Sequence, residues 1–226
     1  MTESIRAHPD FNVHAVLIER GGHLVYEEYF SGKDELYGSP LGVVVFNRET
    51  RHDLRSVTKS VVSALVGIAA DSGAISSLDT PLLDYFPEYK DLQGPERRRI
   101  TIRHALTMSA GLEWNEEVPY NDPQNDEIAM TRNRDPIRYV LGRAIIAPPG
   151  TSWRYNGGTT QVLGTIVQRA TKQPLLDYAR AVLLSPLGIT DVQWLGHLAG
   201  ISPASRRRHR DFACARAILP SSARCI

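Results

Sequence analysis

A serine hydroxyl and a lysine amine lie three residues apart, at Ser56 and Lys59, where a strongly apolar segment begins. Residues i and i+3 share one face of a helix, so we expect the two groups to lie side by side. Burial removes water from an ammonium and lowers its pKa, so a lysine in an apolar helix can act as a base near neutral pH. This pair is typical of a serine nucleophile whose proton is taken by the lysine.

Lysine is also rare in this chain, which has 4 Lys against 22 Arg. Arginine stays protonated and could not act as the base. The alternative interpretation is structural, with Ser56 as a helix N-cap and the Lys59 ammonium extended to water. A Ser-x-x-Lys tetrad is short enough to occur by chance, so the catalytic interpretation depends on the apolar helix that follows it.

The elements that would position this pair can be read from periodicity and turn residues. Residues 57–70 are apolar nearly all round, which predicts a buried helix that ends near Gly73. Residues 13–19 and 24–30 are rich in strand formers and are joined by Gly21-Gly22, which predicts a β-hairpin, and 42–46 is a third strand candidate. Caps and prolines predict further helices at 81–85, 101–108, 137–141, 160–169 and 174–184.

Two polar segments between the predicted helices are candidates for the border of a site. Residues 112–126 contain Trp114 and Tyr120 and indicate a long loop. The stretch Pro148-Pro-Gly-Thr-Ser-Trp-Arg-Tyr-Asn-Gly-Gly158 fixes a turn, and its last glycines indicate that something approaches the backbone closely. The alternative is an ordinary loop before the next helix.

Composition indicates one globular soluble domain, or one domain with a tail. The chain has 226 residues, of which 42% are hydrophobic, and a net charge of +1. No apolar run reaches membrane-spanning length, and residues 1–10 lack the apolar core of a signal peptide. We therefore expect a cytoplasmic protein without a membrane partner, and a lost leader would leave a periplasmic or secreted location open. Cys214 and Cys225 match no metal-binding spacing.

Several further motifs follow the Ser56-x-x-Lys59 tetrad in a fixed order. They are Thr101-Ile-Arg-His-Ala-Leu-Thr-Met-Ser-Ala-Gly-Leu112, Pro148-Pro-Gly150, Tyr155-Asn-Gly-Gly158, Gln161-Val-Leu-Gly164 and Pro186-Leu-Gly188. Together they resemble the serine β-lactamase and penicillin-binding-protein family, nearest to its class C-like esterases, D-aminopeptidases and 6-aminohexanoate-dimer hydrolases. The resemblance implies an α/β (α+β) fold of the β-lactamase/transpeptidase type, with an antiparallel sheet flanked by helices and an all-helical subdomain.

The resemblance also implies a role for each matching residue. Ser56 resembles the nucleophile that forms an acyl-enzyme, Lys59 the base, and Tyr155 the phenol that relays a proton to the leaving group and later from water. The backbone N–H of Ser56 would supply one half of an oxyanion hole. His104 would be structural. The implied chemistry is hydrolysis of a small-molecule ester or amide, with no metal and no cofactor.

The second motif departs from the family pattern. The family usually has Tyr-x-Asn, whereas this chain has Tyr155-Asn156-Gly157. The amide that usually contacts a β-lactam side chain is therefore missing unless Asn156 replaces it. We place Asn156 and Gly157 as candidate substrate-binding residues, and the change favours an esterase or amidase over a β-lactamase.

The family's third motif, a Lys or His followed by a small residue and Gly, has no counterpart after Gly164. The resemblance runs from about residue 11 to about residue 195, which predicts an incomplete domain at 11–196 that lacks the C-terminal strands. The N-terminal hairpin would then expose its edge and one apolar face. An inactive truncated fragment, or a non-catalytic protein that binds an acyl group at its serine, is thus the alternative to a working hydrolase.

Residues 197–226 show no strand alternation and differ in charge from the rest. They hold six Arg, no Lys and one acid, a net charge of +5, against −4 for the remainder. We expect a disordered basic tail outside the family domain. The alternatives are a shifted reading frame and a nucleic-acid-binding tail. The segment has no interleaved aromatic residue other than Phe212, which argues against a nucleic-acid-binding tail, so no nucleic-acid partner is expected.

Overall fold

The computed structural model describes residues 2–36, 39–196 and 213–220 of the chain. Contacts between residues divide it into two compact units. The first holds Met1–Leu54, Asp191–Gln193 and Ile218–Ile226, and the second holds Arg55–Thr190 and Trp194–Ala217. No helix in the described ranges combines the length and the apolar character needed to cross a membrane.

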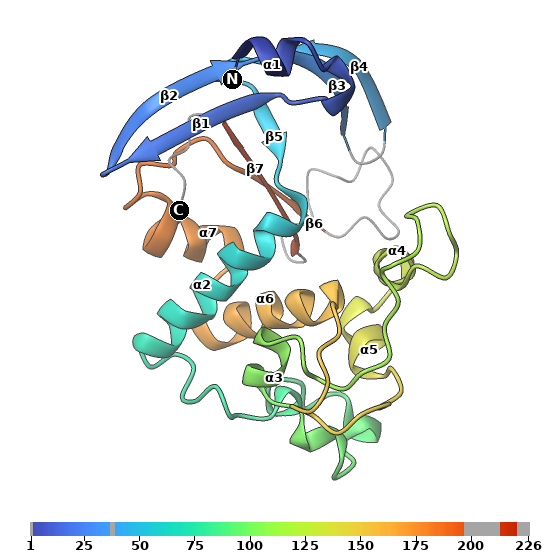
Figure 1. The fold of residues 1–226 in the computed structure, drawn as a ribbon. Coiled ribbons are helices and arrows are strands. Elements are labelled where there is room, and N and C mark those ends of the chain that lie inside the picture. The colour runs from blue at the N-terminus through green and yellow to red at the C-terminus, as the bar shows by residue number, and fades with distance from the viewer. Residues whose placement is uncertain (1, 37–38, 197–212, 221–226) are drawn as a thin grey trace. The chain divides into compact units, whose positions relative to one another are not determined.

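The first unit is built on β-hairpins (Figure 1). Strand β1 (Ala15–Arg20) pairs antiparallel with β2 (His23–Tyr29), and the glycines between them take positive φ angles of 59° and 77°. Such angles suit a two-residue hairpin turn, so the predicted hairpin is confirmed. Two short helices, α1 (Thr2–Arg6) and η1 (Pro9–Phe11), precede it.

A second hairpin follows directly. Strand β3 (Ser31–Leu36) pairs antiparallel with β4 (Ser39–Val45), which covers most of the predicted third strand. The sequence of β3, Ser-Gly-Lys-Asp-Glu-Leu, has few strand formers, and the strand was not predicted. Its backbone ladder with β4 overrides that weak propensity. Val43 and Val45 of β4 are 71% and 75% exposed.

The segment expected to hold no strand contains one. Strand β7 (Ala213–Pro220) pairs antiparallel with β5 (Arg51–Asp53), so the expectation was wrong for these eight residues. Ladder pairing uses backbone N–H and C=O groups and does not require alternating side chains. Strand β6 spans Gln193–Gly196. The rest of the expected basic tail, at 197–212 and 221–226, lies outside the described residues, and the domain boundary at residue 196 stays a prediction.

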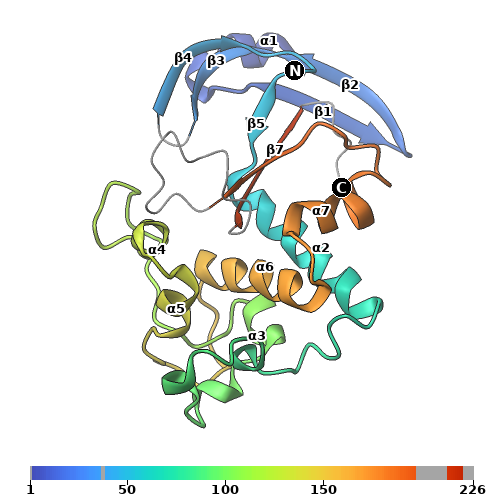
Figure 2. The same cartoon turned by 180° about the vertical axis from the view of Figure 1, so that it is seen from behind.

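The core of the second unit is formed where α2 (Thr58–Asp71) packs against α6 (Gly157–Thr171), as Figures 1 and 2 show from opposite sides. Leu65 and Val66 of α2 and Ile166 and Val167 of α6 are 0% exposed. Burial of side chains of this size stabilises the fold by about 1.5–3 kcal/mol each. The predicted buried helix is confirmed, and it ends with Gly73 at a φ of 77°.

Short helices surround this pair. The structure has η2 (Arg55–Val57), η3 (Leu82–Tyr85), η4 (Lys90–Leu92), η5 (Arg97–Arg99), α3 (Ile102–Leu106), α4 (Asp126–Arg132), α5 (Pro136–Leu141), α7 (Leu175–Ala179) and the π-helical η6 (Arg180–Leu184). Two of the predicted caps are present, whereas no side chain caps η3. The Thr101 side chain accepts from the His104 N–H, and the Asp135 side chain from the Arg138 N–H. Met108 has a φ of 53°, so α3 ends before the predicted residue 108.

Candidate active site

The second unit brings the three predicted catalytic side chains together. The Lys59 Nζ donates a hydrogen bond to the Ser56 Oγ at 3.0 Å, and the Tyr155 hydroxyl donates to the same oxygen at 2.7 Å. The Lys59 Nζ also lies 4.8 Å from the centroid of the Tyr155 ring. Both distances to Ser56 Oγ are within reach of direct proton transfer.

Ser56 lies in the turn η2 and not on the first turn of α2. The N-cap residue of α2 is Val57, and no side chain caps the helix there. The structural alternative for Ser56, a helix cap, is therefore not what this structure shows. The preceding residue, Arg55, has a φ of 44°, a left-handed conformation that costs on the order of 1 kcal/mol for a residue with a side chain.

Lys59 is half-buried, and its ammonium is directed at Ser56 and Tyr155. Thr58 beside it is 0% exposed, so α2 enters the core immediately after the serine. The alternative for Lys59 was an ammonium extended to water. The structure instead shows the ammonium in contact with Ser56. The burial expected for Lys59 is only partial.

Tyr155 is positioned by backbone hydrogen bonds between two segments. The N–H of Gly150 donates to the Ser109 carbonyl at 2.8 Å, and the N–H of Arg154 donates to the Met108 carbonyl at 2.8 Å. A Cβ on Gly111 would lie 2.1 Å from the carbonyl oxygen of Ala147, and Gly111 has a φ of 74°. Only glycine fits there. These contacts fix the chain that leads into Tyr155.

His104 takes part in the same arrangement as a structural residue. Its Nδ1 accepts the N–H of Thr101 at 3.2 Å and completes a capping box at the start of α3. A Cβ on Gly150 would lie 3.1 Å from the His104 Nε2. The imidazole therefore packs against the turn before Tyr155, which agrees with the packing role expected for it.

Asn156 caps the start of α6, and its role in substrate binding stays a prediction. Its Oδ1 accepts the N–H of Thr159 at 3.0 Å and caps α6, and the residue is 3% exposed. An asparagine before a helix is a preferred N-cap, so the signal was present in the sequence. The side-chain oxygen is engaged inside the protein, and the structure does not bring it to the Ser56 hydroxyl.

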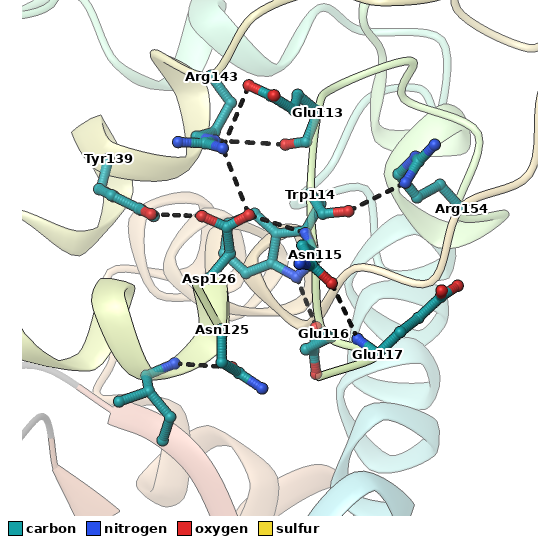
Figure 3. A network of polar contacts seen from close by, with 11 residues as sticks. Glu113, Trp114, Asn115, Glu116, Glu117, Asn125, Asp126, Tyr139, Arg143 and Arg154 are labelled. Carbon is teal, nitrogen blue, oxygen red and sulfur yellow. Dashed lines mark hydrogen bonds and ion pairs between the residues drawn. The ribbon is translucent and has the colours of Figure 1, made fainter. Parts of the chain in front are cut away.

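Gly157 and Gly158 make room for side chains of the loop that follows α3. The N–H of Gly157 donates to the Glu116 Oε2 at 2.6 Å. The Trp114 Nε1 donates to the same oxygen at 2.6 Å, as Figure 3 shows. A Cβ on Gly158 would lie 2.6 Å from both the Trp114 Cη2 and the Val140 Cγ2. The close approach expected at these glycines is thus made by the protein's own side chains. Sequence reasoning missed Glu116, although it placed the loop at the border of a site.

A buried polar network holds this loop in place (Figure 3). Asp126 is 6% exposed, and it accepts hydrogen bonds from the Asn115 N–H at 2.7 Å and from the Tyr139 hydroxyl at 2.5 Å. Burial and this hydrogen bond raise the pKa of Tyr139 to about 12. Arg143 reaches the same carboxylate at 3.3 Å. These groups line a pocket of about 650 Å³ that Arg154 also borders.

The structure offers no candidate metal centre in the ranges it describes. No group of three or more His, Cys, Asp or Glu side chains gathers there in a way that could hold a metal ion.

Comparison with known proteins gives a family match over most of the chain. The family model described as Beta-lactamase matches residues 2–222. The match extends past residue 195, near which the resemblance seen in the motifs ends. Esterase EstB from Burkholderia gladioli is 27% identical over 191 residues, which cover 77% of this chain and 45% of the esterase. The chain thus spans less than half the length of this relative.

Solved structures share the fold at low sequence identity. A penicillin binding protein from Bacillus halodurans has a TM-score of 0.69 at 16% identity, over 99% of this chain and 71% of that one. A protein designated a 6-aminohexanoate-dimer hydrolase, from Bacillus anthracis, has a TM-score of 0.68 at 19% identity, over 98% of this chain and 53% of that one. The expected β-lactamase/transpeptidase-like fold is confirmed, and the chain covers only part of it.

Proposed function

The chain belongs to the beta-lactamase family, and we propose that it is a serine hydrolase that cleaves a small ester or amide through an acyl-enzyme. One observation carries the proposal. The Ser56 Oγ lies within hydrogen-bond distance of both the Lys59 amine and the Tyr155 phenol. An activated nucleophile requires such a contact with a base, and a second group that moves protons completes the set.

The proposed reaction has two steps. In the first, the Ser56 Oγ attacks the carbonyl carbon while its proton passes to the Lys59 amine, and the Tyr155 phenol protonates the leaving alcohol or amine. In the second, water loses a proton to the same pair of groups and attacks the acyl carbon, which releases the acid and restores the Ser56 hydroxyl. The positive end of α2 next to Ser56 favours the developing oxyanion.

An ester or linear amide fits the site better than a β-lactam. Position 157 is glycine, and the amide oxygen of Asn156 caps α6, so the usual amide contact of the family's second motif is missing. We expect a short-chain nitrophenyl ester to be hydrolysed faster than a chromogenic cephalosporin. Faster turnover of the cephalosporin would contradict this part of the proposal.

A second candidate function is non-catalytic: Ser56 becomes acylated, or the site binds an acyl group, without turnover. The sequence has no Lys or His followed by a small residue and Gly after Gly164, so the second oxyanion donor that the family takes from this motif has no counterpart. In this case the serine would still react, and the acyl group would remain attached.

The test is intact-mass measurement after treatment with a fluorophosphonate, together with release of nitrophenol from p-nitrophenyl butyrate. Attack by the Ser56 Oγ on phosphorus expels fluoride, and the serine proton leaves with it, so the chain gains the probe's mass less HF. We expect one label per chain, lost in Ser56→Ala and kept in Ser60→Ala, a matched change of an exposed serine on α2. Labelling with turnover supports the hydrolase, and labelling without turnover supports the second candidate. A folded chain that takes no label rejects both.

A further inference from the structure

Glu116 is a half-buried carboxylate without a cationic partner in the described parts of the chain. Its two hydrogen bonds, from the Trp114 Nε1 and the Gly157 N–H, both end on Oε2. Several other carboxylates of the same unit are paired with arginines, such as Glu88 with Arg169 at 2.6 Å and Asp79 with Arg103 at 2.7 Å. A carboxylate has about four acceptor sites, so Oε1 keeps its capacity to accept.

This carboxylate lies against the backbone two residues after Tyr155, where its Oε2 accepts the Gly157 N–H. Position 157 is where the family's second motif usually has asparagine. A Cβ there would lie 3.0 Å from both Glu116 oxygens, so the carboxylate takes the space of the missing side chain. Tyr155 in turn donates its hydroxyl to the Ser56 Oγ.

We infer that Glu116 is a specificity-determining residue that selects substrates with a positively charged amine near the scissile bond. The inference rests on the proposed function and names the substrate class of the same site. A carboxylate that has lost part of its water without a counter-ion gains more from a cation than an exposed one does. The absence of a side chain at Gly157 leaves room for this carboxylate next to the backbone that follows Tyr155.

The competing explanation is that Glu116 only anchors its loop to the first turn of α6. In that case the loop needs the Glu116 oxygen as a hydrogen-bond acceptor, and it does not need the negative charge. Glu116→Gln separates the two, because a glutamine oxygen can accept from both the Trp114 Nε1 and the Gly157 N–H while the charge is lost. Glu117→Gln is the matched control, since Glu117 is exposed, adjacent and carries the same charge.

The first experiment compares kcat/KM for pairs of esters that differ in a cation. On the acyl side the pair is p-nitrophenyl β-alaninate and p-nitrophenyl butyrate, and on the alcohol side it is butyrylcholine and dimethylbutyl butyrate. We expect the cationic member of one pair to be preferred by roughly tenfold or more, as for a charge pair sheltered from water. The preference should vanish in Glu116→Gln and persist in Glu117→Gln. An unchanged preference in Glu116→Gln, or none in the parent protein, overturns the inference.

A binding experiment keeps the inference testable if the chain does not turn over esters. In Ser56→Ala, calorimetry would measure the affinity for β-alanine ethyl ester, for ethyl butyrate and for butyrylcholine. We expect a cationic ester to bind roughly tenfold tighter than the neutral one, and the added Glu116→Gln change to remove the difference. Equal affinities overturn the inference about Glu116. Loss of Ser56-dependent labelling overturns the proposed function instead, so the two failures are distinct.

Discussion

The Tyr155 hydroxyl donates a 2.7 Å hydrogen bond to the Ser56 Oγ, although 99 residues separate the two in the chain. The other contact of Ser56, with Lys59, is made within three residues. The site thus joins a local pair, Ser56 in η2 and Lys59 on α2, to one distant partner. The local pair requires one helical turn, whereas the third group requires the packing of α2 on α6 and the loops before α6.

Replacing Tyr155 by phenylalanine should separate proton transfer from packing. Tyr155→Phe keeps the ring that the Lys59 ammonium contacts at 4.8 Å and removes the hydroxyl. We expect kcat for p-nitrophenyl butyrate to fall by about 100-fold or more, because a positioned acid or base contributes on that order. Circular dichroism should stay unchanged. Tyr178→Phe, on α7 of the same unit, is the control, and equal kcat in the two variants would contradict a proton-transfer role.

Lys59→Arg tests whether the amine acts as a base. The substitution keeps a positive charge next to Ser56, but a guanidinium does not lose its proton at ordinary pH. We expect the rate of fluorophosphonate labelling at Ser56 to fall by about 100-fold or more. The rate is measured from the labelled fraction over time by mass spectrometry. A labelling rate equal to that of the parent would show that positive charge alone is sufficient.

Gly158→Ala should destabilise the fold through the loop that contains Trp114. The added Cβ would lie 2.6 Å from the Trp114 Cη2 and from the Val140 Cγ2, and both side chains are buried. We expect a loss of about 1–3 kcal/mol in the free energy of unfolding, measured by urea denaturation. Gly67→Ala is the matched control, because a Cβ there meets nothing within 4 Å and α2 should gain about 0.5–1 kcal/mol. Equal effects would rule out the clash.

Stability of the first unit should fall at acid pH because of His52. Burial, and then the charge of His14, lower the pKa of His52 below its usual value near 6.5. A lowered pKa means that the unfolded chain binds the proton more readily, so this contribution is complete above about pH 6.5 and is lost as the pH falls through the folded-state pKa. Thermal melts between about pH 7.5 and 5.5 should show a smaller decrease in His52→Gln than in the parent. An equal decrease would exclude His52 as a source.

The elements that local sequence determines were predicted well. The apolar run at 57–70 became α2 at Thr58–Asp71, and the Ser56–Lys59 contact followed from helical spacing. The start of α6 was predicted at residue 160 and lies at Gly157, because two glycines read as a turn. Strand β3 was missed because its residues favour strands weakly and its partner β4 determines its conformation.

Two parts of the site could be predicted: the contact between residues close in sequence, and the residues that belong to family motifs. Tyr155 was assigned by resemblance, since nothing in its own neighbourhood directs it to Ser56. Glu116 was missed because its place at Gly157 depends on how the loop of residues 113–126 is held by Asp126. Asn156 was assigned to substrate and caps α6, because the same side chain suits either role until the helix start is known.

The hydrogen bonds that hold the segment before Tyr155 run between backbone groups, from Gly150 to Ser109 and from Arg154 to Met108. Backbone groups are present whatever the side chains are, so this support tolerates mutation of most neighbours. Glu117, which is exposed, can then be varied in a library while the Tyr155 phenol keeps its place. Directed evolution of this chain would best begin at that position and take up Glu116 afterwards, because the Glu116 Oε2 also accepts the Gly157 N–H.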